Sequence, residues 1–426
     1  MHSRTLIPAC ANHAPAIDLY REKFMNANTS NSSSRSPENM KRRTVLRGAA
    51  WATPVIAMAV SAPLAAASPC KRYADVAVNL PSPNSNHAGV TSWTVPPGVT
   101  EIEYTVLGAA GGASYNNGRG GAGAEIVGAL AVTPGQSLQF IVGQGGIGSL
   151  AGSETTTGLL GGSGYGNGGP SGGSDGSTGT SASFVGASGG GGSAILVGGA
   201  PIVVAGGGGG EGVAVGLAQP VNAGQWQYNP TQAGGSGGDV TQPGNDANML
   251  WSPNPYTPAI SPKLIASNGG GAASGATGGA GGAVSTNISA STSPLLVDTA
   301  TAAGLGGGAH VAATGGAGGA GAFAERTTVV IDNSVKGILP GGASGGGGGG
   351  GFAGGGGGGT VAAAYKGDYT VTSTSVPNAL LGVASGGGAG SSLTPTGAVI
   401  RRGPNANSVP DHREPGLITI RHCATA

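Results

Sequence analysis

Apolar and polar residues alternate in several short segments of the chain. In residues 101–106 the apolar side chains of Ile102, Tyr104 and Val106 alternate with polar ones, which is the period of two of a half-buried strand. The same alternation appears in 72–80 and in 416–423. The simplest arrangement of these last two segments is a pair of neighbouring strands.

Other segments also predict strands. Residues 124–143 contain two strand patterns joined at Thr133-Pro134-Gly135-Gln136, where Pro followed by Gly suits the centre of a type II turn. In the second pattern Leu138, Phe140 and Val142 share one face. Further predicted strands are Ala194–Val197, Pro201–Ala205, Thr327–Ile331, Tyr369–Val371 and Leu417–Arg421. Because no segment after residue 69 shows a convincing amphipathic helix, we expect an all-β fold.

Long glycine runs separate the predicted strands, and they have two interpretations. Runs such as 345–351 and 354–359 resemble flexible linkers, because glycine loses the most freedom on folding. In two other tracts, however, glycine recurs at every third position, which is the period of a left-handed helix of polyproline II type. These positions are Gly275, Gly278 and Gly281, and Gly315, Gly318 and Gly321.

Packing decides between the two interpretations. A single polyglycine helix has no internal hydrogen bonds, and ordering its backbone costs about 1–2 kcal/mol per residue. Helices packed side by side can bond their N–H and C=O groups to one another, and only residues without a Cβ allow that spacing. We therefore expect an ordered lattice in the long runs and a weaker tendency in the more polar stretch 211–268.

Composition supports an ordered chain. Glycine and proline make up 117 of the 426 residues (90 plus 27), but charged residues are only 9% and hydrophobic residues 38%, unlike most disordered chains. The formal net charge of +1 leaves no basic footprint for nucleic acid. Aromatic residues, at 4%, limit the size of a conventional core.

Residues 41–69 predict an export signal. A basic start, an apolar stretch from Gly48 to Val60 and small residues around Ala67 form this pattern, and Arg42 and Arg43 give it the twin-arginine form. We expect a prefix outside the fold at 1–39, a signal peptide at 40–67 cleaved after Ala67, and one glycine-rich β domain at 68–426 with a loop insertion around 211–268. Met1, Met25 and Met40 all stay open as the start, and the secreted chain has no membrane segment or wall-sorting motif.

Two cysteines remain after this signal, and they lie near the two ends of the mature chain. Cys70 and Cys423 adjoin the two predicted terminal strands, and an exported protein meets oxidising conditions. We expect a Cys70–Cys423 disulfide, which would contribute roughly 4–5 kcal/mol in the chain-entropy model. Two free thiols are the alternative.

The order of these segments resembles the glycine-rich domain of anaplastic lymphoma kinase and leukocyte tyrosine kinase, which recurs in bacterial secreted proteins. The resemblance covers most of 88–421, with 211–268 a poor fit. It implies a jelly-roll-like β-sandwich with a bundle of polyglycine helices emerging from its loops. The kinases use this domain to bind ligands, but this chain has no kinase domain or membrane span. The matching pieces are Trp93-Thr94-Val95-Pro96, Gly108–Gly112, Val132–Leu138, Ile141–Gly143, Gly190–Ala194, Ile202–Gly210, Gly345–Gly351, Gly354–Gly359 and Leu417–Ile420.

The sequence contains no motif from which we assign a catalytic, cofactor-binding or metal-binding residue. The G-x-S-x-G pattern occurs around Ser188 and Ser344, but neither serine follows a buried strand and opens a helix. Asp175 and Asp239 lie beside glycines without the tandem repeats of calcium-binding solenoids, which leaves a single calcium site as an alternative. The histidines of the mature chain, none at metal-ligand spacing, are His87, His310, His412 and His422.

Four aromatic residues in 224–258 are the candidate contact residues. They are Trp226, Tyr228, Trp251 and Tyr256, in a segment rich in Pro and Asn. An exposed loop with such anchors can bind a glycan or a protein surface. The alternative is that the rings cover the side of the glycine bundle as a small core.

The sequence therefore favours an exported, non-enzymatic structural or adhesion protein without a cofactor. We expect it outside the cell or loosely held at the cell surface, with a protein or glycan surface as its partner and no nucleic acid. A secreted enzyme and a ligand-binding signalling module are the alternatives, and ice binding through flat polyglycine faces is a third. Its oligomeric state and biological role are not readable from the sequence.

Overall fold

A computed structural model describes the part of the chain that follows the predicted signal. The described residues are 73–82, 86–114, 118–148, 158–173, 185–219, 227–228, 235–251, 263–284, 295–323, 328–331, 334–338, 343–366, 378–410 and 412–423. The chain divides into two units, Met1–Ala66 and Ala67–Ala426, and every described residue belongs to the second.

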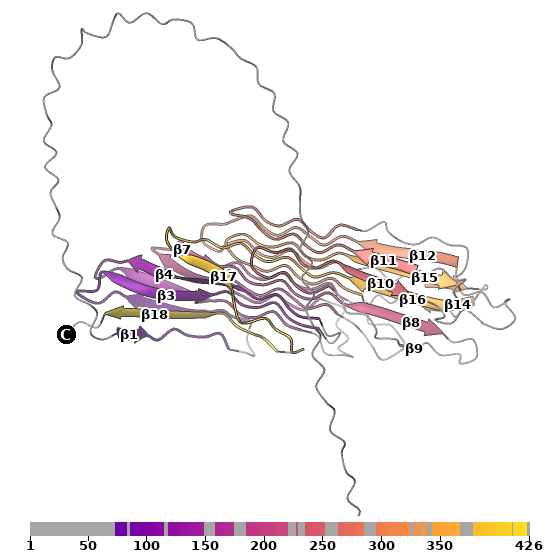
Figure 1. Cartoon of the computed structure of the whole chain (residues 1–426), viewed down its shortest axis with the longest axis horizontal. Helices are drawn as coiled ribbons and strands as arrows, with labels where there is room; N and C mark the ends of the chain where they lie inside the picture. The colour runs from indigo at the N-terminus through magenta and orange to yellow at the C-terminus, as the bar shows by residue number, and fades with distance from the viewer. Residues whose placement is uncertain are drawn as a thin grey trace, which may run out of the picture. The chain divides into compact units, whose positions relative to one another are not determined.

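In these described residues the regular structure is entirely β, as the sequence predicts, and all strand pairs are antiparallel (Figure 1). The strands are β1 (Tyr73–Val76), β2 (Gly89–Thr94), β3 (Glu101–Leu107), β4 (Ala124–Ala131), β5 (Ser137–Val142), β6 (Ser193–Val197), β7 (Ala200–Ala205), β8 (Ala214–Gln219), β9 (Gln227–Tyr228), β10 (Ala247–Trp251), β11 (Lys263–Ser267), β12 (Leu295–Ala302), β13 (Thr328–Ile331), β14 (Ser334–Ile338), β15 (Thr360–Lys366), β16 (Asn378–Ala384), β17 (Val399–Arg402) and β18 (Leu417–Cys423).

Two sheets lie together at one end of the glycine-rich segments. The first has the order β1-β18-β3-β4-β17, and the second has the order β2-β5-β6-β7. The first and last strands of the described chain are neighbours, with Tyr73 opposite Cys423 and Val76 opposite Ile420. The predicted pairing of the terminal segments is therefore confirmed, and β18 fills the position between β1 and β3.

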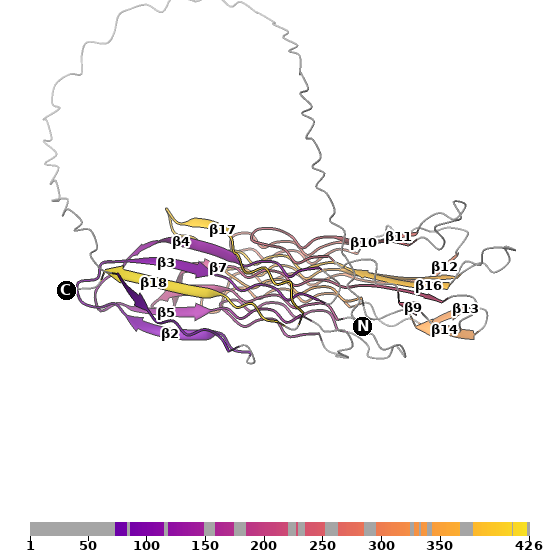
Figure 2. The same ribbon diagram turned by 60° about the horizontal axis from the view of Figure 1, so that its bottom comes forward.

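One apolar core joins the two sheets, which lie one above the other in Figure 2. The apolar positions of the predicted alternation, such as Ile102 and Val106, point into it, while Glu101 and Glu103 are exposed. Burying each large apolar side chain contributes about 1.5–3 kcal/mol, so this core is the main source of stability at this end. The fully buried members include Ile102, Val106, Ile126, Leu138, Phe140, Val142, Ile195 and Val203.

The turn at Pro134-Gly135 connects these two sheets. The N–H of Gln136 donates to the carbonyl of Thr133 at 2.9 Å, and Gly135 has a φ of +83°. A positive φ at this position needs glycine, as in a type II turn. The turn is therefore where the sequence predicts it, and it passes the chain from β4 of one sheet to β5 of the other.

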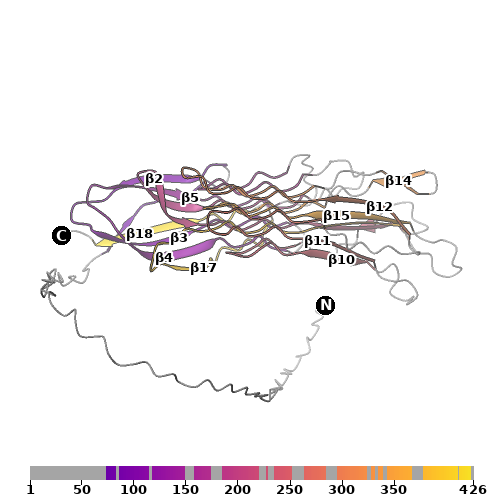
Figure 3. The same ribbon diagram turned by 90° about the horizontal axis from the view of Figure 1, so that it is seen from above.

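Most of the remaining strands lie at the opposite end of the glycine-rich segments (Figures 1 and 3). A second five-stranded sheet has the order β12-β15-β16-β8-β9, the hairpin β10-β11 packs against β15 and β16, and β13 pairs with β14. A smaller core holds this end together. It consists of Ala214, Ala247, Ile265, Val361, Ala363, Leu381 and Val383. Most of these strands were not predicted, and Tyr369–Val371 lies outside the described residues.

Between the two ends, glycine-rich segments bond to one another through their main chains with a period of three. From Gly345 to Phe352 every N–H group donates a hydrogen bond, and consecutive residues donate to different neighbours. Every third residue from Gly345 donates to segment 316–322, every third from Gly346 to segment 385–391, and Gly347 and Gly350 donate to segment 187–190.

The carbonyl groups of this central segment follow the same rule. Those of Gly345 to Gly350 accept hydrogen bonds from three further segments, again in turn. Segment 345–350 is therefore bonded to six neighbours: 316–322, 385–391, 187–190, 169–172, 355–358 and 207–210. The N–H and C=O groups of this segment therefore form hydrogen bonds although it is not part of a regular sheet. These bonds offset the entropy that an ordered glycine run loses.

The spacing of these segments excludes side chains. We call segment 345–350 and its six bonded neighbours the glycine bundle. A Cβ on Gly348 would lie 2.0 Å from the carbonyl oxygen of Gly355, and similar backbone clashes occur at most glycines of the bundle. The three-residue repeat noted in the sequence starts later than expected, however. Gly275 and Gly315 have φ values of +51° and +69° and lie at turns, so the repeat within the bundle begins at Gly278 and Gly318.

Candidate functional site

The structure reaches only part of the predicted site residues. Arg42, Arg43, Cys70, Trp226 and Tyr256 lie outside the described residues, so the export signal and the disulfide stay predictions. Tyr73, three residues after Cys70 in the sequence, is opposite Cys423 in the register of β1 and β18.

The two candidate aromatics that are described belong to different sheets. Tyr228 is opposite Leu217 in the pair β9–β8, and Trp251 is opposite Lys263 in the hairpin β10–β11. Both strands are at the end of the molecule that contains β15 and β16. The contact role of the four aromatics stays a prediction.

Both serines of the G-x-S-x-G matches are buried and bound to the main chain. Ser188 Oγ accepts a hydrogen bond from the N–H of Ile147 at 2.8 Å, and Ser344 Oγ accepts one from the N–H of Gly186. Both belong to bonded glycine-rich segments, and neither stands on a strand-to-helix turn. These hydroxyls stabilise the bundle and are closed to a substrate.

Three of the four described histidines have structural partners. The His310 ring stacks on Phe352 with centroids 3.8 Å apart, and His412 Nε2 is 3.1 Å from Glu414. His422 lies beside Trp93, and His87 is exposed. Within the described ranges, no group of three or more His, Cys, Asp or Glu side chains is arranged to hold a metal ion.

The Asp239 carboxylate joins three segments of the chain. It accepts the N–H of Ala122 at 2.7 Å and pairs with Arg402 at 2.7 Å and Arg119 at 3.9 Å. Through these contacts Asp239 connects segment 235–239 to β17 and to segment 118–123.

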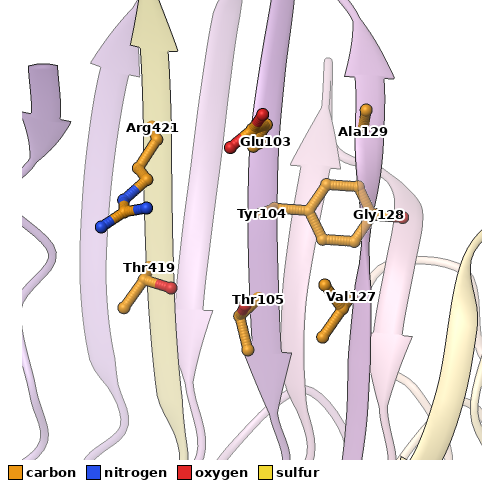
Figure 4. Close-up of a pocket in the computed structure, with 8 residues that line it drawn as sticks. All are labelled: Glu103, Tyr104, Thr105, Val127, Gly128, Ala129, Thr419 and Arg421. Carbon is orange, nitrogen blue, oxygen red and sulfur yellow. The ribbon is translucent and has the colours of Figure 1, made fainter. Parts of the chain in front are cut away.

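A shallow hollow of ≈ 440 Å³ lies on β18, β3 and β4 (Figure 4). Its walls come from outward-facing positions in two register rows: Arg421 opposite Glu103 opposite Ala129, and Thr419 opposite Thr105 opposite Val127. The hollow therefore exists because polar positions of the alternating strands stand side by side on the outer face of the sheet. Its lining residues are Glu103, Tyr104, Thr105, Val127, Gly128, Ala129, Thr419 and Arg421.

Tyr104 and Gly128 form a cross-strand pair under this hollow. They are directly opposite in register, and the tyrosine side chain reaches across to β4 (Figure 4). A Cβ on Gly128 would lie 2.7 Å from Tyr104 Oη, so the ring occupies the space of the missing side chain. Burial raises the pKa of the Tyr104 phenol above its usual value.

The charges around the hollow are screened by solvent. The Tyr73 hydroxyl donates to Glu103 at 3.2 Å, and the charge of Glu103, reinforced by this hydrogen bond, raises the pKa of Tyr73. Arg421 Nε is 3.3 Å from Asp75, with both side chains more than half exposed. Such surface pairs contribute little to stability.

The hollow offers a carboxylate, a guanidinium and two hydroxyl groups on a rigid sheet. These groups can hold a polar or zwitterionic group by hydrogen bonds. The lining contains no serine, cysteine or histidine, so the nucleophile–base pairs of common hydrolases are not assembled there.

Sequence reasoning missed this hollow and also missed Glu211. The alternation in 101–107 marks Glu103 and Thr105 as outward positions, but their neighbours Arg421 and Ala129 are known only from the register. Glu211 directly follows five glycines, Gly206–Gly210, and a charged residue inside such a run was the available signal.

No family model and no curated protein matches the chain. In the part of the chain that the structure describes, no helix is long and apolar enough to cross a membrane.

Proposed function

We propose that the protein is an exported, non-enzymatic structural or adhesion protein in which an ordered glycine bundle rigidly holds two strand-rich ends. The observation that carries this proposal is the bonding of segment 345–350 to six neighbouring segments. A chain that only tethered two domains would not need its glycine backbone bonded in this way.

The glycine-rich segments of the proposal are polyglycine II helices. Three residues per turn place consecutive N–H groups about 120° apart, so each residue in a turn faces a different neighbour. The hydrogen bonds of residues 345–352 follow this rotation, and the Cβ clashes require the close spacing that such helices have. Both observations support the assignment.

The two sheets around the larger core are, in this proposal, a jelly-roll-like sandwich. Support comes from the shared core of β3, β4, β5 and β18 and from β18 closing the sheet beside β1. Together with the glycine bundle, this arrangement agrees with the resemblance to the glycine-rich domain of the two kinases. The partner surface proposed for the chain is a protein or a glycan.

Binding experiments with the full chain test the adhesive role. A fluorescent derivative is applied to a glycan array and to immobilised cell-surface preparations, beside a variant with Trp226, Tyr228, Trp251 and Tyr256 replaced by serine. Substitution is preferable to deleting 224–258, because that deletion would remove β9 and β10 and leave β11 without its partner. Aromatic anchors dominate such interfaces, so we expect the variant to lose binding by at least about tenfold.

A matched variant distinguishes the two surfaces. Glu103→Gln with Arg421→Gln alters only exposed groups of the hollow at the other end, and we expect it to bind like the wild type with an unchanged melting temperature. Loss of binding in this variant alone would move the contact to the hollow. Absence of binding by the wild-type chain to every surface would contradict the adhesive role.

A further inference from the structure

Among the buried residues that the structure describes, Glu211 is the one with an ionisable side chain of Asp, Glu, Lys or Arg type. Its side chain has 0% exposure, and every other buried polar residue that the structure describes is Ser, Thr, Gln or Asn. Its main chain is part of the bundle: its N–H donates to Gly112 at 3.2 Å and its carbonyl accepts from Ala187 at 2.8 Å. The carboxyl group is therefore fixed inside the glycine packing.

Ser114 and Gly118 contact this carboxyl group. Oε2 accepts a hydrogen bond from the N–H of Ser114 at 2.6 Å, and Oε1 lies so close to Gly118 that a Cβ there would be 1.9 Å away. Oε1 and Ser114 Oγ are both buried. A carboxylate in this position would be poorly solvated.

No cation compensates the carboxyl group in the described structure. The described segments that contact Glu211 are 108–114, 118–120, 185–190 and 343–348, and the titratable residue among them is Arg119, beside Gly118. Arg119 pairs with Asp239 instead, and Asp239 also pairs with Arg402. A buried carboxyl without a cation is much less costly when it is protonated.

We propose that Glu211 is a pH-sensitive switch in the glycine bundle. Its protonated carboxyl fits the closed packing against Ser114 and Gly118, and its ionisation favours an opened packing in which water reaches the carboxylate. This inference rests on the contacts of Glu211 and is independent of any role in adhesion.

The direction of the pH effect follows from proton binding. Burial raises the pKa of the Glu211 carboxyl from 4.5 to about 7, and hydrogen bonds from the Ser114 N–H, the Ser114 hydroxyl and the Gly118 N–H oppose this rise. Between these two values the folded chain keeps a proton that the unfolded chain has released. The contribution of Glu211 to the free energy of unfolding is therefore fully present below about pH 4.5, is lost as the pH rises towards 7, and does not change further above it.

Denaturant unfolding of the full chain between roughly pH 4.5 and 8 tests the switch against the variant Glu211→Gln. The amide keeps the size of the carboxyl group but cannot ionise. We expect the unfolding equilibrium constant of the wild type, divided by that of the variant, to rise on the order of 100-fold across this range. Taking the ratio removes the pH effects of all other groups.

The control is Glu101→Gln, which removes an exposed carboxyl group of β3 and should leave the wild-type pH profile unchanged. A ratio for Glu211→Gln that stays constant within about twofold would overturn the proposal. If that variant does not fold, the wild-type Glu211 carboxyl can be titrated by ¹³C NMR. A midpoint near 7 supports the switch, and a midpoint below about 5 refutes it.

Discussion

At the scale of single residues, glycine acts in this protein mainly through its lack of a Cβ. Gly348 shows the effect most clearly, because it donates to Gly319 while its Cα faces the carbonyl of Gly355. Any side chain at this position would push two bonded segments apart. The energetic advantage of the close packing must exceed the entropy that glycine loses on folding.

This reasoning predicts opposite results for two glycine-to-alanine substitutions. Gly348→Ala places a Cβ 2.0 Å from backbone, so we expect a loss of about 3 kcal/mol or more in the free energy of unfolding. Gly306 is exposed, and a Cβ there would meet its nearest atom at 3.5 Å. For Gly306→Ala we expect no loss, or a gain below about 1 kcal/mol from the stiffer unfolded chain.

Urea unfolding monitored by circular dichroism measures both variants. Equal, small effects at the two positions would mean that Gly348 is not closely packed, and would refute the packing role of the central glycines.

At the scale of elements, the two sheets around the larger core depend on a strand from the far end of the sequence. β18 pairs with both β1 and β3 and places Ile418 and Ile420 in the core. It is an inner strand of a sheet in which β1, β3 and β4 precede it by hundreds of residues. The sheet and its core are therefore complete only when β18 is in place.

Neighbouring residues of β18 should differ sharply on substitution. Ile420 is 1% exposed, and Ile420→Ala should lower the free energy of unfolding by about 2–5 kcal/mol through lost burial and a cavity. Thr419 faces outward in the same strand, so Thr419→Ala should change it by less than about 0.5 kcal/mol. Thermal and denaturant unfolding of both variants provide the measurement, and similar losses would contradict the observed register.

Some strands could be predicted from the sequence, and others could not. Strands with alternating residues, such as 101–107 and 417–423, were predictable because one face is buried and the other exposed. β15 and β16 were missed because alanine and glycine alternate weakly in hydropathy and their partners are distant in sequence. The hollow and the environment of Glu211 depend on such long-range pairings, so neither was predictable from local pattern.

At the scale of the whole 67–426 unit, the glycine bundle connects the two strand-rich ends. β7 passes through residues 206–213 into β8, and β16 leaves through 385–391 towards β17, so the same segments that bond to one another also join the ends. Six bonded neighbours around the central segment make independent movement of one segment costly. We expect the two ends to be held at a fixed separation.

Amide hydrogen exchange of residues 345–352 in the full chain is the most direct test of this account, with a synthetic peptide of the same sequence as the reference. Each of these N–H groups donates a hydrogen bond to a neighbouring segment, so the account predicts exchange slower than in the peptide by at least about 1,000-fold at each position. Exchange at the rate of the peptide would show that the glycine run is a flexible tether, and would contradict the ordered bundle and the function proposed from it.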